Sequence, residues 1–278
     1  MESQGPVAQK QIQAVGQYQA AYFETGSSTD APEAPTLLFL HGFLGESSLW
    51  QPLMEQLSYR CIALDLLGFG ESSKPRLKYT IWHQTEFLQS FIEALQLRQL
   101  ILIGHSYGGW TSAAYAIEPS TRLDGLVLLA PAGIRDDSFV GRYNYMRPIL
   151  WETPAVDWAL AAIRPVAYLL GQGKTYRQVA MARREFSKQP VAKSFIVDRL
   201  RPEDAIDTVE QEIHHIEAPT LVIAGQEDST IPLWHCETYG RDIPNARLEV
   251  LPDTDHDLIR TRRPRIAELI TGFVNAAV

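Results

Sequence analysis

The stretch that decides the fold is Leu100-Ile101-Leu102-Ile103, followed by Gly104-His105-Ser106-Tyr107-Gly108-Gly109. Four apolar residues in a row are typical of a strand that is covered on both faces of a parallel sheet. Helix-like sequence then runs over Tyr107–Ile117, so the Gly-x-Ser-x-Gly pattern lies at a sharp turn from strand to helix. We predict that this turn holds Ser106 in a strained conformation, and that Cβ atoms at the flanking glycines would collide with neighbouring backbone.

Other strand-length apolar runs flank this stretch, and each is followed by Gly or Pro or by helix-like sequence. They are Thr36–Leu40, Arg60–Asp65, Gly125–Ala130, Pro219–Ala224 and Arg247–Leu251. Helical sequence is expected between or after them at Ser48–Leu57, Ile81–Leu95 and about Pro264 to Ala276. This alternation predicts an α/β fold with a mostly parallel central sheet and helices on both faces. Near the N-terminus, Gln11–Val15 and Tyr18–Phe23 surround Gly16-Gln17 and predict an antiparallel hairpin at the sheet edge.

The strand rhythm stops after Pro131 and resumes near residue 219. We therefore predict a helical cap at 133–213, inserted into a core formed by 1–132 and 214–278. The cap is rich in aromatic side chains, and Trp151 and Trp158 are candidates for a pocket that takes an apolar group. Packing within the cap itself would use the same side chains.

Composition excludes several classes of protein. A net charge of −8 and a pI near 5.4 oppose nucleic acid as the main partner. No secretory signal is recognisable, and charges and prolines interrupt the most apolar region, 146–170, so no transmembrane segment is expected. The two cysteines, Cys61 and Cys236, are expected to be reduced core thiols. We expect a cytoplasmic enzyme.

Four segments resemble the α/β-hydrolase superfamily. They are Leu40 to Gly45 (LHGFLG), Asp65 to Ser72 (DLLGFGES), Gly104 to Gly109 (GHSYGG), and the pair Gly225 to Asp228 (GQED) and Asp255 to Asp257 (DHD). The resemblance covers nearly all of the chain from Gln11 onward. It implies an α/β-hydrolase fold with a helical cap, in which a nucleophile, an acid and a histidine follow in chain order.

Ser106, Asp228 and His256 match this order. A serine hydroxyl needs a base to take its proton, and a carboxylate must hold the imidazole in the correct tautomer. We favour Asp228 as the acid because a short turn after a buried strand resembles the acid loop of the superfamily. Other carboxylates remain open as alternatives: Glu227, Asp253, Asp255 and Asp257, and also Asp136 and Asp137, since some members place the acid after the strand that ends at Ala130.

The resemblance also implies an oxyanion hole formed by the backbone N–H groups of Phe43 and Tyr107. It casts His41 and His105 as residues that shape the pocket. The segment from Asp65 to Ser72 is interpreted as structural, with Asp65 and Ser72 satisfying nearby backbone donors.

The expected activity is hydrolysis of a carboxylic ester, or of a related acyl bond, in a small molecule with an apolar group, through an acyl-enzyme at Ser106. A carbon–carbon bond hydrolase or a lyase with the same triad is the alternative, and a receptor without catalytic activity is a third reading. The mechanism requires no metal or organic cofactor, and the sequence has no Cys/His cluster with zinc spacing. Neither the natural substrate nor the oligomeric state follows from the sequence.

Overall fold

The computed structural model describes residues 10–26, 34–119, 121–139, 147–148, 150–151, 153–187, 189–195 and 207–277. The chain divides into two compact units. The core unit comprises Met1–Ser73, Thr80–Arg135 and Asp207–Val278, and the second unit comprises Lys74–Tyr79 and Asp136–Ile206. The predicted cap boundaries, 133–213, stay a prediction.

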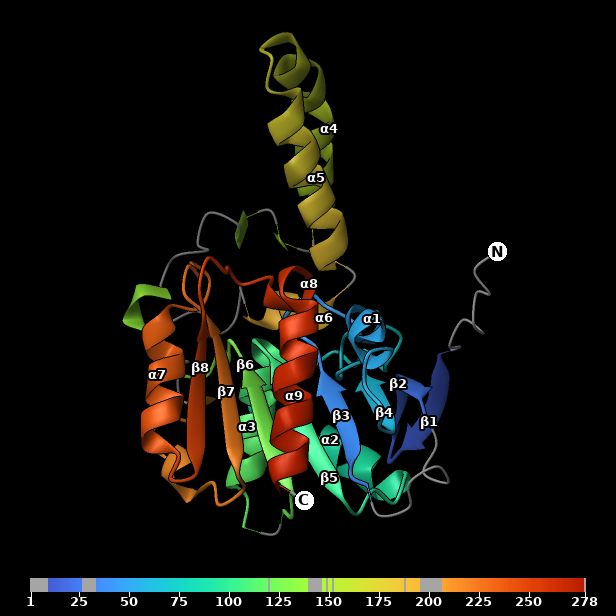
Figure 1. The fold of residues 1–278 in the computed structure, drawn as a ribbon. Coiled ribbons are helices and arrows are strands. Elements are labelled where there is room, and N and C mark those ends of the chain that lie inside the picture. Colours follow the sequence, from blue (N-terminus) through green and yellow to red (C-terminus); the bar gives the residue numbers. More distant parts are fainter. Residues whose placement is uncertain are drawn as a thin grey trace, which may run out of the picture. The chain divides into compact units, whose positions relative to one another are not determined.

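An eight-stranded sheet forms the centre of the core unit, in the order β1-β2-β4-β3-β5-β6-β7-β8 (Figure 1). Its strands are β1 (Gln11–Val15), β2 (Tyr18–Thr25), β3 (Thr36–Leu40), β4 (Cys61–Leu64), β5 (Leu100–His105), β6 (Gly125–Leu129), β7 (Thr220–Gly225) and β8 (Ala246–Leu251). The β1–β2 and β2–β4 pairs are antiparallel, and the other pairs are parallel. This confirms the predicted α/β-hydrolase fold with an antiparallel hairpin at its N-terminal edge.

Helices cover both faces of this sheet, as expected for strands that are apolar along their whole length (Figure 1). Every residue of β3, β4, β5, β6 and β7 is buried. The helices of the core unit are α1 (Gln51–Met54), α2 (Ile81–Ala94), α3 (Tyr107–Ile117), α7 (Leu233–Asp242), α8 (Leu258–Thr261) and α9 (Arg263–Ala277). Apolar side chains of α1 and α9 pack with those of the central strands in one cluster. The carboxyl ends of the parallel strands therefore converge on one edge of a well-packed sheet.

The helices of the core unit differ from the sequence prediction in two ways. The segment predicted as one helix over Ser48–Leu57 is a short 3₁₀ turn at Ser47–Trp50 followed by α1, because Pro52 can occupy only the first turn of an α-helix. The helices α7 and α8 were not predicted. Both cysteines are free and buried, as predicted.

The second unit contains a pair of antiparallel helices, α4 (Pro154–Leu169) and α5 (Gly173–Ser187), followed by the short α6 (Pro190–Lys193). Gly171 adopts φ +72° in the turn between α4 and α5, a conformation that glycine tolerates at no steric cost. Arg183 of α5 donates two hydrogen bonds to the Asp157 carboxylate of α4, at 2.6 and 2.7 Å. None of the helices in the described part of the chain combines the length and apolarity that crossing a bilayer requires.

A buried carboxylate organises the loops after β3 and β4. Asp65 accepts hydrogen bonds from the backbone N–H of Ser47 at 2.6 Å and of Glu71 at 2.8 Å, and the Lys10 ammonium lies 2.8 Å from it. Burial alone would raise the pKa of Asp65, but the Glu71 N–H, Lys10 and Ser47 together hold it below its usual value. The Ser72 hydroxyl accepts the backbone N–H of Ala21. The structural interpretation of Asp65 and Ser72 is confirmed.

We expect Asp65→Asn to lower the free energy of unfolding by about 3 kcal/mol, since an amide cannot accept both backbone N–H groups while facing the Lys10 ammonium. Glu71→Gln is the matched control, because Glu71 is an exposed partner of the same lysine at 3.3 Å. Its effect should stay below about 0.5 kcal/mol. Denaturant unfolding of both variants measures the difference, and equal losses would contradict the central role of Asp65.

Candidate active site

Ser106 lies at the junction of β5 and α3, as the order of elements predicted. Its backbone has φ +54° and ψ −114°, a region that non-glycine residues rarely occupy. The Ser106 N–H donates to Leu129 O on β6 at 2.9 Å, and the Ser106 carbonyl accepts the N–H groups of Trp110 and Ala132 at 3.0 Å each. These bonds to the neighbouring strand and to the first turn of α3 hold the strained residue in place.

Two glycines make this turn possible. A Cβ on Gly104 would overlap the carbonyl oxygen of Gly108 and the hydroxyl of Ser112, and a Cβ on Gly108 would overlap the backbone of Leu40 and His41. Both overlaps are far inside normal contact distance. The structure therefore confirms the steric reason that the sequence suggested for glycine at these positions.

The Asp228 carboxylate and the His256 imidazole meet beyond the carboxyl ends of β7 and β8. His256 Nδ1 lies 2.7 Å from Asp228 Oδ2, although the residues are 28 positions apart in sequence. The Asp228 side chain is 1% exposed, whereas that of His256 is 23% exposed. The backbone N–H groups of Thr230 and Ile231 both donate to Asp228 Oδ1 at 2.8 Å. The carboxylate is thus fully hydrogen-bonded and fixed in orientation.

This orientation has a consequence for the proton on His256. A carboxylate only accepts hydrogen bonds, so Nδ1 carries the proton that it donates to Asp228. The other ring nitrogen, Nε2, is then left as a proton acceptor, which is the tautomer that a general base for a serine hydroxyl needs. Asp228 is the carboxylate that the structure places against His256.

The other candidate acids contact other groups or lie in another part of the chain. Asp255 Oδ1 accepts the backbone N–H of Asp257, and Asp136 Oδ1 accepts that of Ser138. Asp136 and Asp137 belong to the second unit. Glu227 is exposed and precedes Asp228 in the turn after β7.

Both residues predicted to supply the oxyanion hole lie close to Ser106. Tyr107 is the first residue of α3, where the helix dipole favours negative charge. The Phe43 and Tyr107 rings pack edge to face with centroids 6.0 Å apart. A Cβ built on Gly42 would come within 3.2 Å of Ser106 Cβ. The turn that carries Phe43 therefore packs directly on the candidate nucleophile.

His41 and His105 are both buried, but they make different contacts. His41 Nδ1 lies 2.8 Å from Gly42 O, and its Nε2 accepts the Leu66 N–H at 3.1 Å, so both ring nitrogens bind backbone. Burial lowers the pKa of His41. His105 Nε2 lies 3.1 Å from the carbonyl oxygen of His256, and the two rings are 4.8 Å apart. Among the described residues, His105 Nδ1 has no hydrogen-bond partner.

The contact between His105 and His256 was missed in the sequence. The residues are 151 positions apart, and no periodicity links them. The one available signal was that His105 ends β5 while His256 follows β8, so both face the same edge of the sheet. The predicted pocket residues Trp151 and Trp158 belong to the second unit, and their role stays a prediction.

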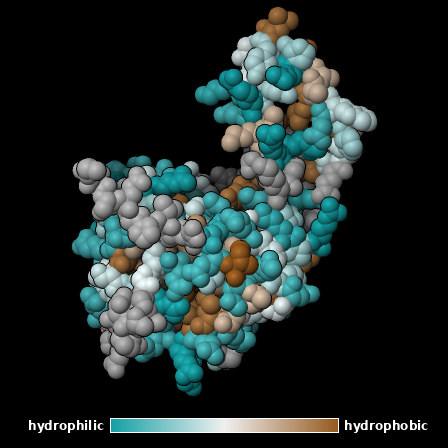
Figure 2. Space-filling view, turned by 90° about the vertical axis from the view of Figure 1, so that its right-hand side faces the viewer, coloured by the Kyte–Doolittle hydropathy of each residue, from teal (hydrophilic) through white to brown (hydrophobic). Residues whose placement is uncertain are grey.

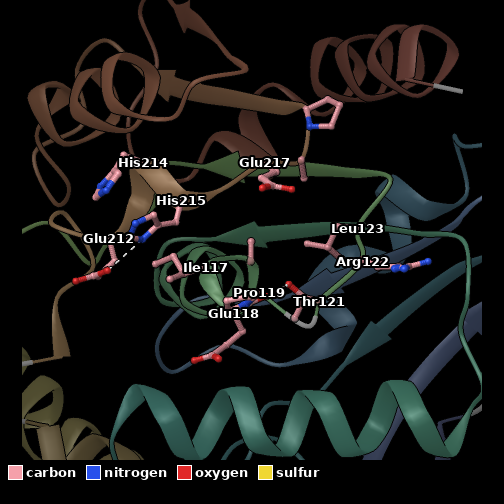
Figure 3. A pocket seen from close by; sticks show the side chains of 13 residues that line it. Ile117, Glu118, Pro119, Thr121, Arg122, Leu123, Glu212, His214, His215 and Glu217 are labelled. Carbon is pink, nitrogen blue, oxygen red and sulfur yellow. Dashed lines mark hydrogen bonds and ion pairs between the residues drawn. The ribbon is translucent and has the colours of Figure 1, made fainter.

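A groove of about 800 Å³ lies on the core unit beside the residues that precede β6 and β7 (Figure 3). It is lined by polar and charged side chains that include Glu118, Arg122, Glu212, His214, His215 and Glu217. These residues precede the amino ends of the strands, whereas Ser106, Asp228 and His256 follow the carboxyl ends. Within the described residues, no three His, Cys, Asp or Glu side chains are grouped so that they could hold a metal ion.

The burial of His105 predicts how the stability of the fold depends on pH. Burial, with a smaller effect from the His256 ring, lowers the pKa of His105 from 6.5 to about 3. Between these values the unfolded chain binds a proton at His105 and the folded chain does not. The stability that neutral His105 contributes is therefore complete above about pH 6.5 and is lost as the pH falls toward about 3.

We expect His105→Gln, which retains an N–H donor, to flatten this acid limb by about 1.4 kcal/mol per pH unit relative to the parent protein. Urea unfolding at several pH values in this window measures the slope. Parallel slopes for the two proteins would contradict a neutral, buried His105.

Comparisons with known proteins agree with this fold. Residues 35–261 match the family model described as the alpha/beta hydrolase fold. The chain is 25% identical to the hydrolase YugF of Bacillus subtilis over 99% of this chain and 100% of that one. It is 30% identical to a 2-hydroxymuconate semialdehyde hydrolase of Pseudomonas putida over 78% of each chain.

A solved structure supports the same fold assignment. A thermophilic esterase from Thermogutta terrifontis superposes with a TM-score of 0.71 at 21% identity, over 97% of this chain and 99% of that one. Strand order, the turn at Ser106 and a family match over most of the sequence agree, and the chain belongs to the α/β-hydrolase fold family.

Proposed function

We propose that the protein is a serine hydrolase that cleaves a carboxylic ester or a related acyl bond through an acyl-enzyme at Ser106. The observations that carry this proposal are the 2.7 Å contact between Asp228 and His256, which leaves Nε2 of the imidazole as a proton acceptor, and the strained turn at Ser106. The His256 ring lies 4.8 Å from the ring of His105, the residue that precedes Ser106. Fold membership alone would not suffice, because one fold hosts many chemistries.

In the proposed mechanism, His256 Nε2 takes the proton of the Ser106 hydroxyl while the serine oxygen attacks the carbonyl carbon of the substrate. The carbonyl oxygen becomes an oxyanion, and the N–H groups of Phe43 and Tyr107 donate to it. His256 then returns the proton to the leaving alcohol. The same nitrogen then deprotonates a water molecule, whose oxygen attacks the acyl carbon. The bond between that carbon and Ser106 Oγ breaks, the acid is released, and His256 returns the proton to the serine oxygen.

The immediate surroundings of Ser106 favour a substrate with an apolar group. Phe43, Phe69 and Tyr107 form a cluster of rings with centroids about 6 Å apart beside the nucleophile. Apolar and aromatic walls with a few placed polar groups are typical of small-molecule sites. Trp151 and Trp158 of the second unit are proposed as further pocket residues.

Carbon–carbon bond hydrolysis is the second candidate, because the relative at 30% identity is named for 2-hydroxymuconate semialdehyde. Offering p-nitrophenyl butyrate and 2-hydroxymuconate semialdehyde to the same preparation separates the two activities. We expect a higher kcat/KM for the ester. The reverse order would replace the ester proposal by its alternative.

Ser106→Ala should abolish labelling by a fluorophosphonate probe and lower ester turnover by at least about 10³-fold, because only the serine oxygen can form the covalent adduct. Mass spectrometry of the labelled parent protein should place the adduct on Ser106. A labelled Ser106→Ala protein, or an adduct on another residue, would show that the nucleophile is misassigned.

Asp228→Asn should slow turnover by about 10⁴-fold with little change in melting temperature. The amide oxygen can still accept the N–H groups of Thr230 and Ile231, which turns the amide NH₂ toward His256. His256 Nδ1 must then accept, so the proton moves to Nε2 and the base is lost. Glu227→Gln is the neighbouring control and should keep full activity. Full activity of the Asp228→Asn protein would show that another carboxylate is the acid.

A further inference from the structure

An imidazole occupies the last position of β5, after a run of apolar residues. Leu100 to Ile103 are aliphatic and buried, and His105 is buried as well, with 8% of its surface exposed. Its Nε2 makes one hydrogen bond, and among the described residues its Nδ1 makes none. A buried polar atom without a partner costs free energy that an apolar side chain at this position would avoid. The presence of histidine here therefore needs an explanation beyond the packing of the sheet.

That hydrogen bond fixes the tautomer of His105. Nε2 lies 3.1 Å from the carbonyl oxygen of His256, which can only accept, so Nε2 carries the proton and donates it. Among the titratable groups around the ring, His256 and His41 lower the pKa of His105 and Asp228 raises it, but burial has the largest effect and lowers it. His105 is therefore a neutral hydrogen-bond donor whose acceptor is the main chain of the proposed base.

The His256 carbonyl belongs to a loop that is also held on both sides of this residue. Before His256, the Arg262 guanidinium donates to the main-chain carbonyl oxygens of the two residues that follow β8, at 3.1 and 2.6 Å. After His256, the Asp257 carbonyl accepts two N–H groups of α8 at 3.1 Å each. The bond from His105 holds the residue between these anchors, and it comes from the strand that leads into Ser106.

The opposite edge of the His105 ring faces the turn after β3. A Cβ built on Gly42 would come within 3.0 Å of His105 Nδ1, and Gly42 precedes Phe43, a proposed oxyanion donor. On its other side, the His105 ring packs on the His256 ring with centroids 4.8 Å apart and planes tilted by 38°. One side chain next to Ser106 in sequence thus lies between the turn of the proposed oxyanion hole and the loop of the proposed base.

We propose that His105 is a positioning residue for the reaction: by donating its Nε2–H to the His256 carbonyl, it keeps the His256 imidazole ordered and within reach of the Ser106 hydroxyl. The inference rests on the proposed function, because His105 acts through His256. Asp228 fixes the tautomer of the imidazole, and His105 fixes the main chain that carries it.

Two physical reasons support this division of roles. A displacement of about 1 Å in a reacting group can lower a rate by about 10²-fold, so the main chain of the base has to be held as well as its ring. The donor also has to be neutral, because His256 becomes an imidazolium during the reaction and a second cation 4.8 Å away would oppose that charge. A buried histidine meets both requirements, whereas lysine or arginine would not.

Nuclear magnetic resonance of the parent protein with ¹⁵N-labelled histidine tests the geometry without any substitution. We expect His105 to stay neutral and protonated at Nε2 between about pH 5 and 8. The proton shared by His256 Nδ1 and Asp228 should give a resonance downfield of the backbone amides. A His105 ring that is protonated at Nδ1, or that titrates in this range, would overturn the proposal, and so would the absence of the downfield resonance. No substrate is needed for this measurement.

His105→Met and His105→Gln form the main pair of variants, because the two side chains are similar in length and volume and only the amide can donate a hydrogen bond. His105→Met should lower kcat for p-nitrophenyl butyrate by at least about tenfold and change KM by less than about twofold, since the lost interaction orders the base and does not bind the ester. His105→Gln should restore kcat to within about threefold of the parent protein. In His105→Met, the proton on His256 Nδ1 should also exchange faster with water.

Tyr115→Phe is the matched control for a loss of stability alone. It removes a side-chain hydrogen bond of 2.6 Å from a residue that is 5% exposed and lies near the far end of α3. Both substitutions should lower the melting temperature, but only His105→Met should lower kcat. Circular dichroism checks that each variant is folded, and His105→Leu takes the place of His105→Met if the latter does not fold.

The outcomes separate this inference from the proposed function. If a fluorophosphonate does not label the parent protein at Ser106, the proposed function fails, and the resonances of His105 and His256 decide whether the base is positioned as we infer. If the parent protein is labelled and hydrolyses the ester, equal kcat values for His105→Met and His105→Gln would overturn the positioning role and leave the proposed function intact. An unchanged exchange rate of the His256 proton in His105→Met would also overturn it.

Discussion

The close approach of three backbone segments around Ser106 is the constraint on which the rest of the core unit depends. The end of β5, the first turn of α3 and the turn after β3 meet with no room for a Cβ at Gly104 or Gly108. A non-glycine residue at positive φ costs on the order of 1–3 kcal/mol. Hydrogen bonds from Ser106 to β6 and to α3 offset this cost, because the sheet around them is fully buried. A rigid sheet is what allows the strained turn to persist.

The same rigidity places Asp228, the proposed acid, and His256, the proposed base. Asp228 and His256 both lie in loops, where backbone freedom would normally scatter side-chain positions. Parallel pairing of β7 with β6 and of β8 with β7 brings both loops to the edge that holds Ser106. The N–H groups of Thr230 and Ile231 then fix the carboxylate, and the carboxylate fixes the imidazole. The sheet therefore positions the two loops, and the loops fix the side chains of Asp228 and His256 before any substrate binds.

The two units use apolar residues in opposite ways. In the core unit the apolar side chains of β3 to β7 are removed from water almost completely, which is the main source of folding free energy. In the second unit no residue of α4 is buried, and Figure 2 shows a hydrophobic patch at the end of the helical pair where α4 turns into α5.

The sequence by itself determined the sheet, its strand positions and the place of Ser106, because continuous apolar runs and the glycine-flanked serine are local patterns with one favourable solution. The sequence also limited the candidates for the acid to a few carboxylates. Tertiary structure alone decided that Asp228 meets His256, that His105 contacts the His256 carbonyl, and that Lys10 pairs with Asp65. These contacts join residues from 28 to 151 positions apart, and only the register of the strands brings them together.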